Sequence, residues 1–127
     1  MAVAKKVEEL LVYQKSQISL RAISALVNES ELRRNWRLRD QLLSAATSVS
    51  ANLAEGFGQQ TDRLFVRYLY FCRGSAHEVR AHLASAFQLN HISLEKQSQH
   101  DRMYEEIAMM VTGLIRYLQA SDRKHRG

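Results

Sequence analysis

Apolar residues recur at steps of three and four positions in four separate stretches of the sequence, and no stretch alternates with a period of two over a useful length. Such spacing places apolar side chains along one side of a helix. We therefore predict four helices, at about residues 7–29, 38–56, 62–90 and 94–121. Five glycines and no proline are too few turn residues for an all-β fold, so the sequence predicts an all-α protein.

The segments between the predicted helices are short, about three to eight residues, so consecutive helices should run antiparallel. A chain of 127 residues, 46% of them hydrophobic, is long enough for one domain with a real core. The sequence therefore predicts a single domain over residues 1–127, folded as an up-down-up-down four-helix bundle.

Residues suited to helix ends lie between these helices. Gly56-Phe57-Gly58 follows the second apolar pattern, where a helix C-terminus favours glycine. Thr61 and Ser93 offer side-chain caps for the third and fourth helices, and Asn90 lies where a left-handed terminating residue is expected.

Several classes of protein are disfavoured by what the chain lacks. The single cysteine, Cys72, excludes a disulfide framework and a cysteine-cluster metal site, and its place on an apolar stripe predicts a small buried hydrophobe. No Glu-x-x-His motif suggests a di-iron bundle, and Gly56-Phe57-Gly58 lacks the residues of a phosphate loop. The longest apolar run, Ile107–Val111, is far short of the ~20 residues of a membrane span. We expect a cytoplasmic protein without metal or cofactor.

The third predicted helix carries a basic stripe opposite its apolar side. A net charge of +5 permits an anionic partner. Evenly spaced guanidinium groups suit successive phosphates, and an aromatic ring suits an unpaired base. The stripe is therefore a candidate RNA or DNA site, and the alternatives are a solvated face or a junction between subunits. Its members are Arg63, Arg67, Tyr70, Arg73, His77 and Arg80.

A second basic cluster lies between the first two helices, where Arg33, Arg34, Arg37 and Arg39 surround Trp36. One interpretation is a phosphate-contacting corner with an aromatic platform for stacking. The other, which we favour, has Trp36 closing the end of the bundle, with the arginines in solvent.

Polar residues follow one edge of the second helix beside its apolar stripe, and polar residues of the third helix are their nearest candidate partners. Buried amides and carboxylates need partners, so we predict a hydrogen-bond network that fixes the helix register. In the alternative, enzymatic interpretation, Glu55 and Glu78 form an acid–base pair. The predicted network comprises Gln41, Asn52, Glu55, Ser75 and Glu78.

The first helix carries apolar residues on two sides, which suggests self-association. Leu20, Ile23 and Val27 lie opposite the side that holds Leu11 and Ile18. A bundle helix needs one apolar stripe, so the second would be exposed on a lone subunit. We predict that Leu20, Ile23 and Val27 contact another subunit, and that Gly74, which projects from the third helix, lets that subunit approach closely.

A run in the middle of the chain resembles the signature of a known bacterial family. Asn52-Leu53-Ala54-Glu55-Gly56-Phe57-Gly58, followed by Phe65-Val66-Arg67-Tyr68-Leu69 and Arg73-Gly74-Ser75-Ala76-His77-Glu78, is similar to the proteins encoded in intervening sequences of 23S rRNA genes. The chain departs from that pattern at Ser50, where many members have proline, and at Gln59, where many have a basic residue.

This resemblance implies a four-helix bundle without catalytic activity that assembles as a homo-oligomer, a pentamer. It also implies kinship with accessory proteins of diversity-generating retroelements, which bind nucleic acid and a reverse transcriptase. With the basic stripe, it leads to the hypothesis of a basic homo-oligomer that binds RNA or DNA nonspecifically as an accessory to a larger enzyme. The alternative is a protein-interaction scaffold that binds no nucleic acid.

Overall fold

The computed structural model describes residues 3–126, with side chains up to Lys124. The described residues form four α-helices and two short 3-10 helices. The α-helices are α1 (Leu11–Asn28), α2 (Trp36–Phe57), α3 (Asp62–Gln88) and α4 (Leu94–Arg126), and the 3-10 helices are η1 (Val7–Glu9) and η2 (Glu31–Arg33). The second helix thus begins two residues earlier than the apolar pattern indicates, and the fourth continues five residues further.

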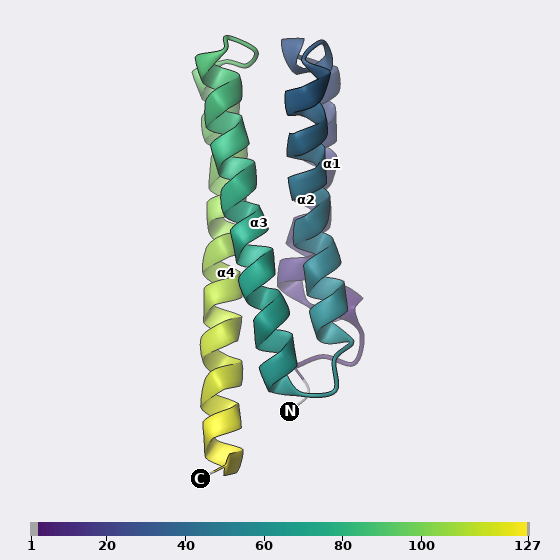
Figure 1. The fold of residues 1–127 in the computed structure, drawn as a ribbon, viewed down its shortest axis with the longest axis vertical. Coiled ribbons are helices and arrows are strands. Elements are labelled where there is room, and N and C mark those ends of the chain that lie inside the picture. The colour runs from purple at the N-terminus through teal and green to yellow at the C-terminus, as the bar shows by residue number, and fades with distance from the viewer. Residues whose placement is uncertain (1–2, 127) are drawn as a thin grey trace.

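Consecutive helices run antiparallel, which confirms the predicted four-helix bundle (Figure 1). The chain ends and the α2–α3 connection lie at one end of the bundle, and the α1–α2 and α3–α4 connections lie at the other (Figure 1). A hydrogen bond between Asn35 Nδ2 and His91 Nε2, 3.0 Å long, joins these last two connections. Asn35 Oδ1 accepts from the backbone N–H of Leu38, so its amide nitrogen is the group that donates to His91.

The expected helix-end residues hold their predicted positions. Thr61 Oγ1 accepts from the backbone N–H of Leu64, and Ser93 Oγ accepts from that of Lys96. Asn90 has a φ of 62°, the left-handed conformation that commonly ends a helix. These contacts confirm the predicted caps of α3 and α4 and the predicted stop after α3.

The predicted orientation of α1 is wrong, because its two apolar sides are exchanged. Ile23 and Val27 are buried in the core of the subunit, and Leu20 packs against that core. Leu11 and Ile18 instead face outward, with 70% and 62% of their surface exposed. Leu20, Ile23 and Val27 are therefore core residues of one subunit, not the exposed stripe that we predicted for an oligomer contact.

Two serines explain the error in α1. Ser16 and Ser19 lie on the inward side, so a count of apolar residues undervalues that side. Ser16 Oγ donates to the carbonyl of Tyr13 and accepts from Ser50 Oγ of α2 at 2.8 Å. A buried hydroxyl with partners is tolerated in a core, which lets a half-polar stripe face inward.

Gly56 allows α2 to lie very close to α3. A Cβ atom at this position would lie 2.8 Å from Tyr68 Cβ and 2.9 Å from Phe65 Cδ1. Both distances are shorter than a normal contact between carbon atoms. The helix ends one residue later, at Phe57, with Gly58 as the cap residue. Gly56-Phe57-Gly58 therefore ends α2 as expected. Its first glycine, in addition, allows the close packing of α2 against α3.

We predict that Gly56→Ala lowers the free energy of unfolding by about 1–3 kcal/mol, because the added methyl group must push the two helices apart. Gly74→Ala is the matched control, since a Cβ there would have no atom within 4 Å. That control should gain about 0.5–1 kcal/mol from better helix propensity. Urea denaturation of both variants measures the difference, and equal stabilities would contradict the role of Gly56.

Candidate nucleic-acid interface

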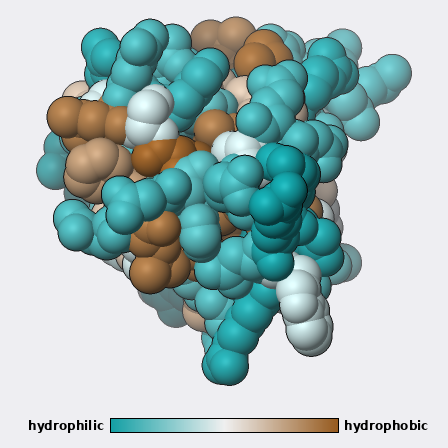
Figure 2. Space-filling view, turned by 90° about the horizontal axis from the view of Figure 1, so that it is seen from above, coloured by the Kyte–Doolittle hydropathy of each residue, from teal (hydrophilic) through white to brown (hydrophobic). Residues whose placement is uncertain are grey.

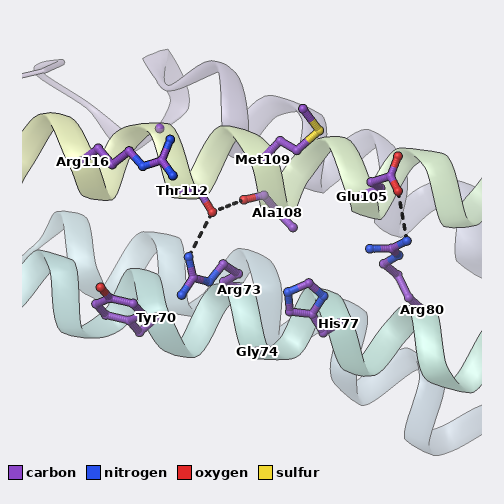
Figure 3. A pocket seen from close by; sticks show the side chains of 11 residues that line it. Tyr70, Arg73, Gly74, His77, Arg80, Glu105, Ala108, Met109, Thr112 and Arg116 are labelled. Atoms are coloured by element: carbon purple, nitrogen blue, oxygen red, sulfur yellow. Dashed lines mark hydrogen bonds and ion pairs between the residues drawn. The ribbon is translucent and has the colours of Figure 1, made fainter.

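A groove of about 700 Å³ runs between α3 and α4 on the surface of the bundle (Figure 3). Five residues of the α3 turns around Gly74 form one wall, and six residues of α4 form the other. The lining residues are Tyr70, Arg73, Gly74, His77 and Arg80 of α3, and Glu105, Ala108, Met109, Thr112, Gly113 and Arg116 of α4. The structure thus places most of the predicted basic stripe in one groove.

Two glycines leave the middle of this groove open. A Cβ atom added to Gly74 or to Gly113 would meet no atom within 4 Å. Both glycines lie well inside long helices, where alanine would favour the helix more. The space above them is therefore not needed for packing within the subunit.

Arg73 is held in position at the groove by two contacts. Its Nη1 donates to Thr112 Oγ1 at 3.0 Å, and its guanidinium carbon lies 4.9 Å from the centre of the Tyr70 ring. Thr112 uses its own proton on the carbonyl of Ala108, so its oxygen is free to accept from Arg73. Within the described residues no carboxylate pairs with Arg73, and it therefore keeps its charge for a partner.

Arg116 lies on α4 along the same part of the groove (Figure 3). Its side chain is exposed, and among the residues that the structure describes it forms no ion pair. Arg67 lies about one turn before Tyr70 on α3. It is also exposed and has no carboxylate partner among the described residues, and its guanidinium carbon lies 5.9 Å from the centre of the Phe71 ring. These two arginines and Arg73 form the unpaired set of this face.

Arg80, one of the predicted phosphate contacts, is paired with two carboxylates of α4 in the structure. Its Nε donates to Asp101 Oδ1 at 2.8 Å, and its Nη2 donates to Glu105 Oε2 at 3.1 Å. The hydrogen bond to Asp101 raises the pKa of the Arg80 guanidinium. Arg80 is thus a cross-link between α3 and α4. Arg63, at the other end of the stripe, lies 4.0 Å from Asp122 and is weakly paired.

The second basic cluster surrounds an exposed tryptophan. Trp36 has 70% of its surface exposed, so the expectation that it closes the bundle end is wrong. Arg33, Arg34 and Arg37 are exposed, as the same interpretation expected. Arg33 and Arg34 both lie within 4 Å of Glu31, whereas Arg37 has no ion pair among the described residues. Figure 2 looks down onto this end of the bundle, where hydrophobic patches interrupt a mainly hydrophilic surface.

The predicted polar network between α2 and α3 does not form. Gln41, Glu55 and Glu78 are exposed, and Asn52 donates only to the carbonyl of Ser48 in its own helix. No hydrogen bond among the described side chains joins these residues or Ser75 across the two helices. Between α2 and α3 the contacts are instead mainly apolar, with the close approach at Gly56 and a hydrogen bond from Cys72 Sγ to the carbonyl of Val49.

The two carboxylates of the enzymatic interpretation do not come together in the structure. Glu55 is exposed on α2, and Glu78 is exposed on α3 with its Oε1 3.9 Å from His82 Nε2, so the two carboxylates form no buried pair. No three side chains of the His, Cys, Asp and Glu types come together in the described part of the chain.

The residues of α4 in the groove were missed by the sequence analysis. Gly113 and Arg116 belong to a helix whose charges show no stripe, and Thr112 is not a typical phosphate ligand. Only the register of α4 against α3, fixed by the Arg80–Asp101 and Arg73–Thr112 contacts, brings them beside the predicted stripe. The one sequence signal for this groove was a glycine in the middle of each of the two helices, Gly74 in α3 and Gly113 in α4.

Cys72 is buried in the core, as predicted. Its Sγ contacts the carbonyl oxygen of Val49 at 3.4 Å, and burial raises the pKa of its thiol to about 12. A thiol needs to ionise before it acts as a nucleophile, so Cys72 is a packing residue.

We predict that Cys72 resists alkylation in the folded protein. With a pKa of about 12, roughly one thiol in 10⁴ is ionised at pH 8, and the core also shields the sulfur. Iodoacetamide labelling followed by mass measurement should find almost no adduct in the native protein and a complete reaction in guanidinium chloride. Rapid labelling of the native protein would show that the thiol is accessible.

No helix in the described residues is long and apolar enough to cross a membrane.

Comparison with known proteins agrees with this fold. A search of curated proteins finds no match. A solved structure from Bacteroides thetaiotaomicron, described as a protein of unknown function from the S23 ribosomal protein family, superposes with a TM-score of 0.74. It shares 23% sequence identity, and the alignment covers 83% of this chain and 98% of that one.

The sequence itself matches a family model over most of its length. Residues 8–113 match the model of the 23S rRNA-intervening sequence protein family. This range contains all of α1, α2 and α3 and the last two residues of η1. It also contains the α4 residues that line the groove up to Gly113. The chain therefore belongs to the family of 23S rRNA-intervening sequence proteins.

Proposed function

We propose that this protein is a cytoplasmic, non-enzymatic homo-oligomer that binds RNA or DNA without sequence preference and needs no cofactor. The observation that carries the proposal is the unpaired set of Arg67, Arg73 and Arg116 on the α3–α4 face, with Tyr70 exposed among them. Arginine forms strong, directional hydrogen bonds to phosphate, and phosphate contacts need no particular base.

Self-association multiplies this charge. Five copies at +5 would carry +25, and a ring concentrates that charge around one axis. The family resemblance supports a pentamer and a partner such as a reverse transcriptase. Both belong to the proposal.

The outward side of α1 supports self-association. It replaces Leu20, Ile23 and Val27, which lie in the core, as the candidate subunit contact. Leu11 and Ile18 are mostly exposed, and Ala25 continues the same side two turns further along the helix. Large exposed aliphatic side chains in a row favour burial against another protein surface. We assign the subunit contact to this side of α1, with Leu11 and Ile18 at its centre.

We predict that the wild-type protein is an oligomer at about 10 μM and that Leu11→Gln/Ile18→Gln shifts it toward single subunits. Each substitution removes apolar surface that the contact would bury, at about 1.5–3 kcal/mol per side chain. Size-exclusion chromatography with light scattering measures the mass, and Leu94→Gln is the control at another exposed leucine. A wild-type protein that elutes as a single subunit would refute the assembly, and an unchanged oligomer in the double variant would refute the α1 contact.

Nucleic-acid binding predicts a steep dependence on salt. Replacing Arg67, Arg73 and Arg116 by Gln removes three cations, so the slope of log K against log salt should become shallower by about 2–3. The control variant replaces Arg33, Arg34 and Arg37 by Gln, which changes the net charge equally at the Trp36 end. Fluorescence anisotropy with short RNA and DNA strands measures both. Undetectable wild-type binding at low salt would refute the function, and an equal loss in both variants would refute the location.

A protein-interaction scaffold remains the second candidate, because the same face also exposes apolar side chains. Phe71, Met109 and Tyr117 are all largely exposed on α3 and α4. Aromatic residues and methionine beside arginine are typical of protein interfaces. Recovery of one protein partner from cell extract after nuclease treatment, together with no affinity for nucleic acid, would favour the scaffold.

A further inference from the structure

We propose that the α3–α4 groove receives one unpaired strand of nucleic acid, with a phosphate between Arg73 and Arg116 and a base against Tyr70. This inference rests on the proposed function and adds the form of the ligand and the place where it sits. The groove, its two glycines and the fixed arginine carry it.

The space above Gly74 and Gly113 is large enough for a ligand. The groove measures about 700 Å³, within the range of sites that hold small molecules, and the two glycines leave its middle open. Glycine weakens each helix relative to alanine, so the packing of the subunit gives no reason for either residue. A ligand that lies along the groove would use this space.

The charge in the groove is uneven, which indicates where a phosphate would bind. At one end the carboxylate of Glu105 and the guanidinium of Arg80 neutralise each other at 3.1 Å. At the other end Arg73 and Arg116 lie on opposite walls without a carboxylate between them (Figure 3). One Nη1 hydrogen of Arg73 is donated to Thr112, and its Nε and Nη2 hydrogens can be donated to an anion. Its position is therefore fixed before the ligand arrives, which reduces the entropy lost on binding.

Tyr70 favours a single strand over a duplex. Arg73 lies against the Tyr70 ring, and 45% of the residue remains exposed. An unpaired base can stack on such a ring, whereas the base faces of a duplex are covered by their neighbours. A half-buried arginine at the wall of a groove is also reached more easily by one flexible strand than by a stiff double helix.

A second copy of the chain fits this groove poorly. The outward side of α1, which we assign to the subunit contact, carries the cation Arg21 one turn after Ile18. Arg73 and Arg116 would repel it. An anionic strand matches the groove in charge, and the apolar side of α1 does not.

Filling the groove without changing its charge tests the inference. Gly74→Leu/Gly113→Leu places two side chains in open space on helices that tolerate them. The control, Ala51→Leu/Ala54→Leu, adds three carbons per site, against four in the filled variant, at exposed positions of α2. The probes are a labelled single strand of mixed sequence and its duplex with the complementary strand, long enough to stay paired at low salt, each measured by anisotropy. Thermal melting by circular dichroism establishes that both variants are folded.

We expect the filled variant to bind the single strand at least about tenfold more weakly than the wild type, with binding of the duplex and of the control variant unchanged. Tyr70→Leu should weaken single-strand binding about tenfold with the same salt slope, because no phosphate contact is lost. Arg73→Lys keeps the charge but loses the forked geometry, so it should also weaken the single strand.

The outcomes separate this inference from the proposed function. If the filled variant binds the single strand as well as the wild type does, the groove is not the site, although the protein still binds nucleic acid. If the wild type prefers the duplex, the assignment of an unpaired strand is wrong. If the wild type binds neither probe at low salt, the proposed function fails and the groove assignment fails with it.

Discussion

The close contact between α2 and α3 at Gly56 is the constraint on which the rest of the structure depends. With no side chain between them, Phe65 and Tyr68 pack directly against the α2 backbone. Beyond this contact the apolar side of α3, from Phe65 to Ala86, continues along the core. Because a helix has two opposite sides, the arginine side must then face outward along α4. The groove, its cations and the proposed ligand site all follow from the orientation of α3.

Much of the fold could be predicted from the sequence, since three helices have a single clear apolar side. Leu42, Leu69 and Ile107, which lie on the apolar stripes of α2, α3 and α4, are fully buried. In α1 apolar residues occur on both sides, and the inward side includes two serines. A simple count cannot choose between such sides, because the hydroxyl of Ser16 is satisfied by Ser50, a residue of another helix. The error therefore arose where tertiary hydrogen bonding overrides hydropathy.

Only the α3 side of the candidate site could be predicted from the sequence. The α3 wall is visible as a charge stripe because its members recur on one helix. Their partners on α4 depend on how α3 and α4 are aligned along their length. The spacing of apolar residues within one helix gives no information about that alignment. That register decides which arginine is available: Arg80 meets Asp101 and Glu105, whereas Arg73 meets Thr112. Two residues of equal charge on one stripe therefore have different roles, one as a cross-link and the other as a free cation.

The burial of Cys72 also determines how copies of this chain can be joined. The chain has one cysteine, and its sulfur lies wholly inside the core. No disulfide through Cys72 can link two folded copies, so the oligomer proposed above would be held together noncovalently. Its assembly would follow mass action, and the assembled share of the protein would fall on dilution. The concentration of the protein, rather than its redox state, would then set how much of that oligomer is present.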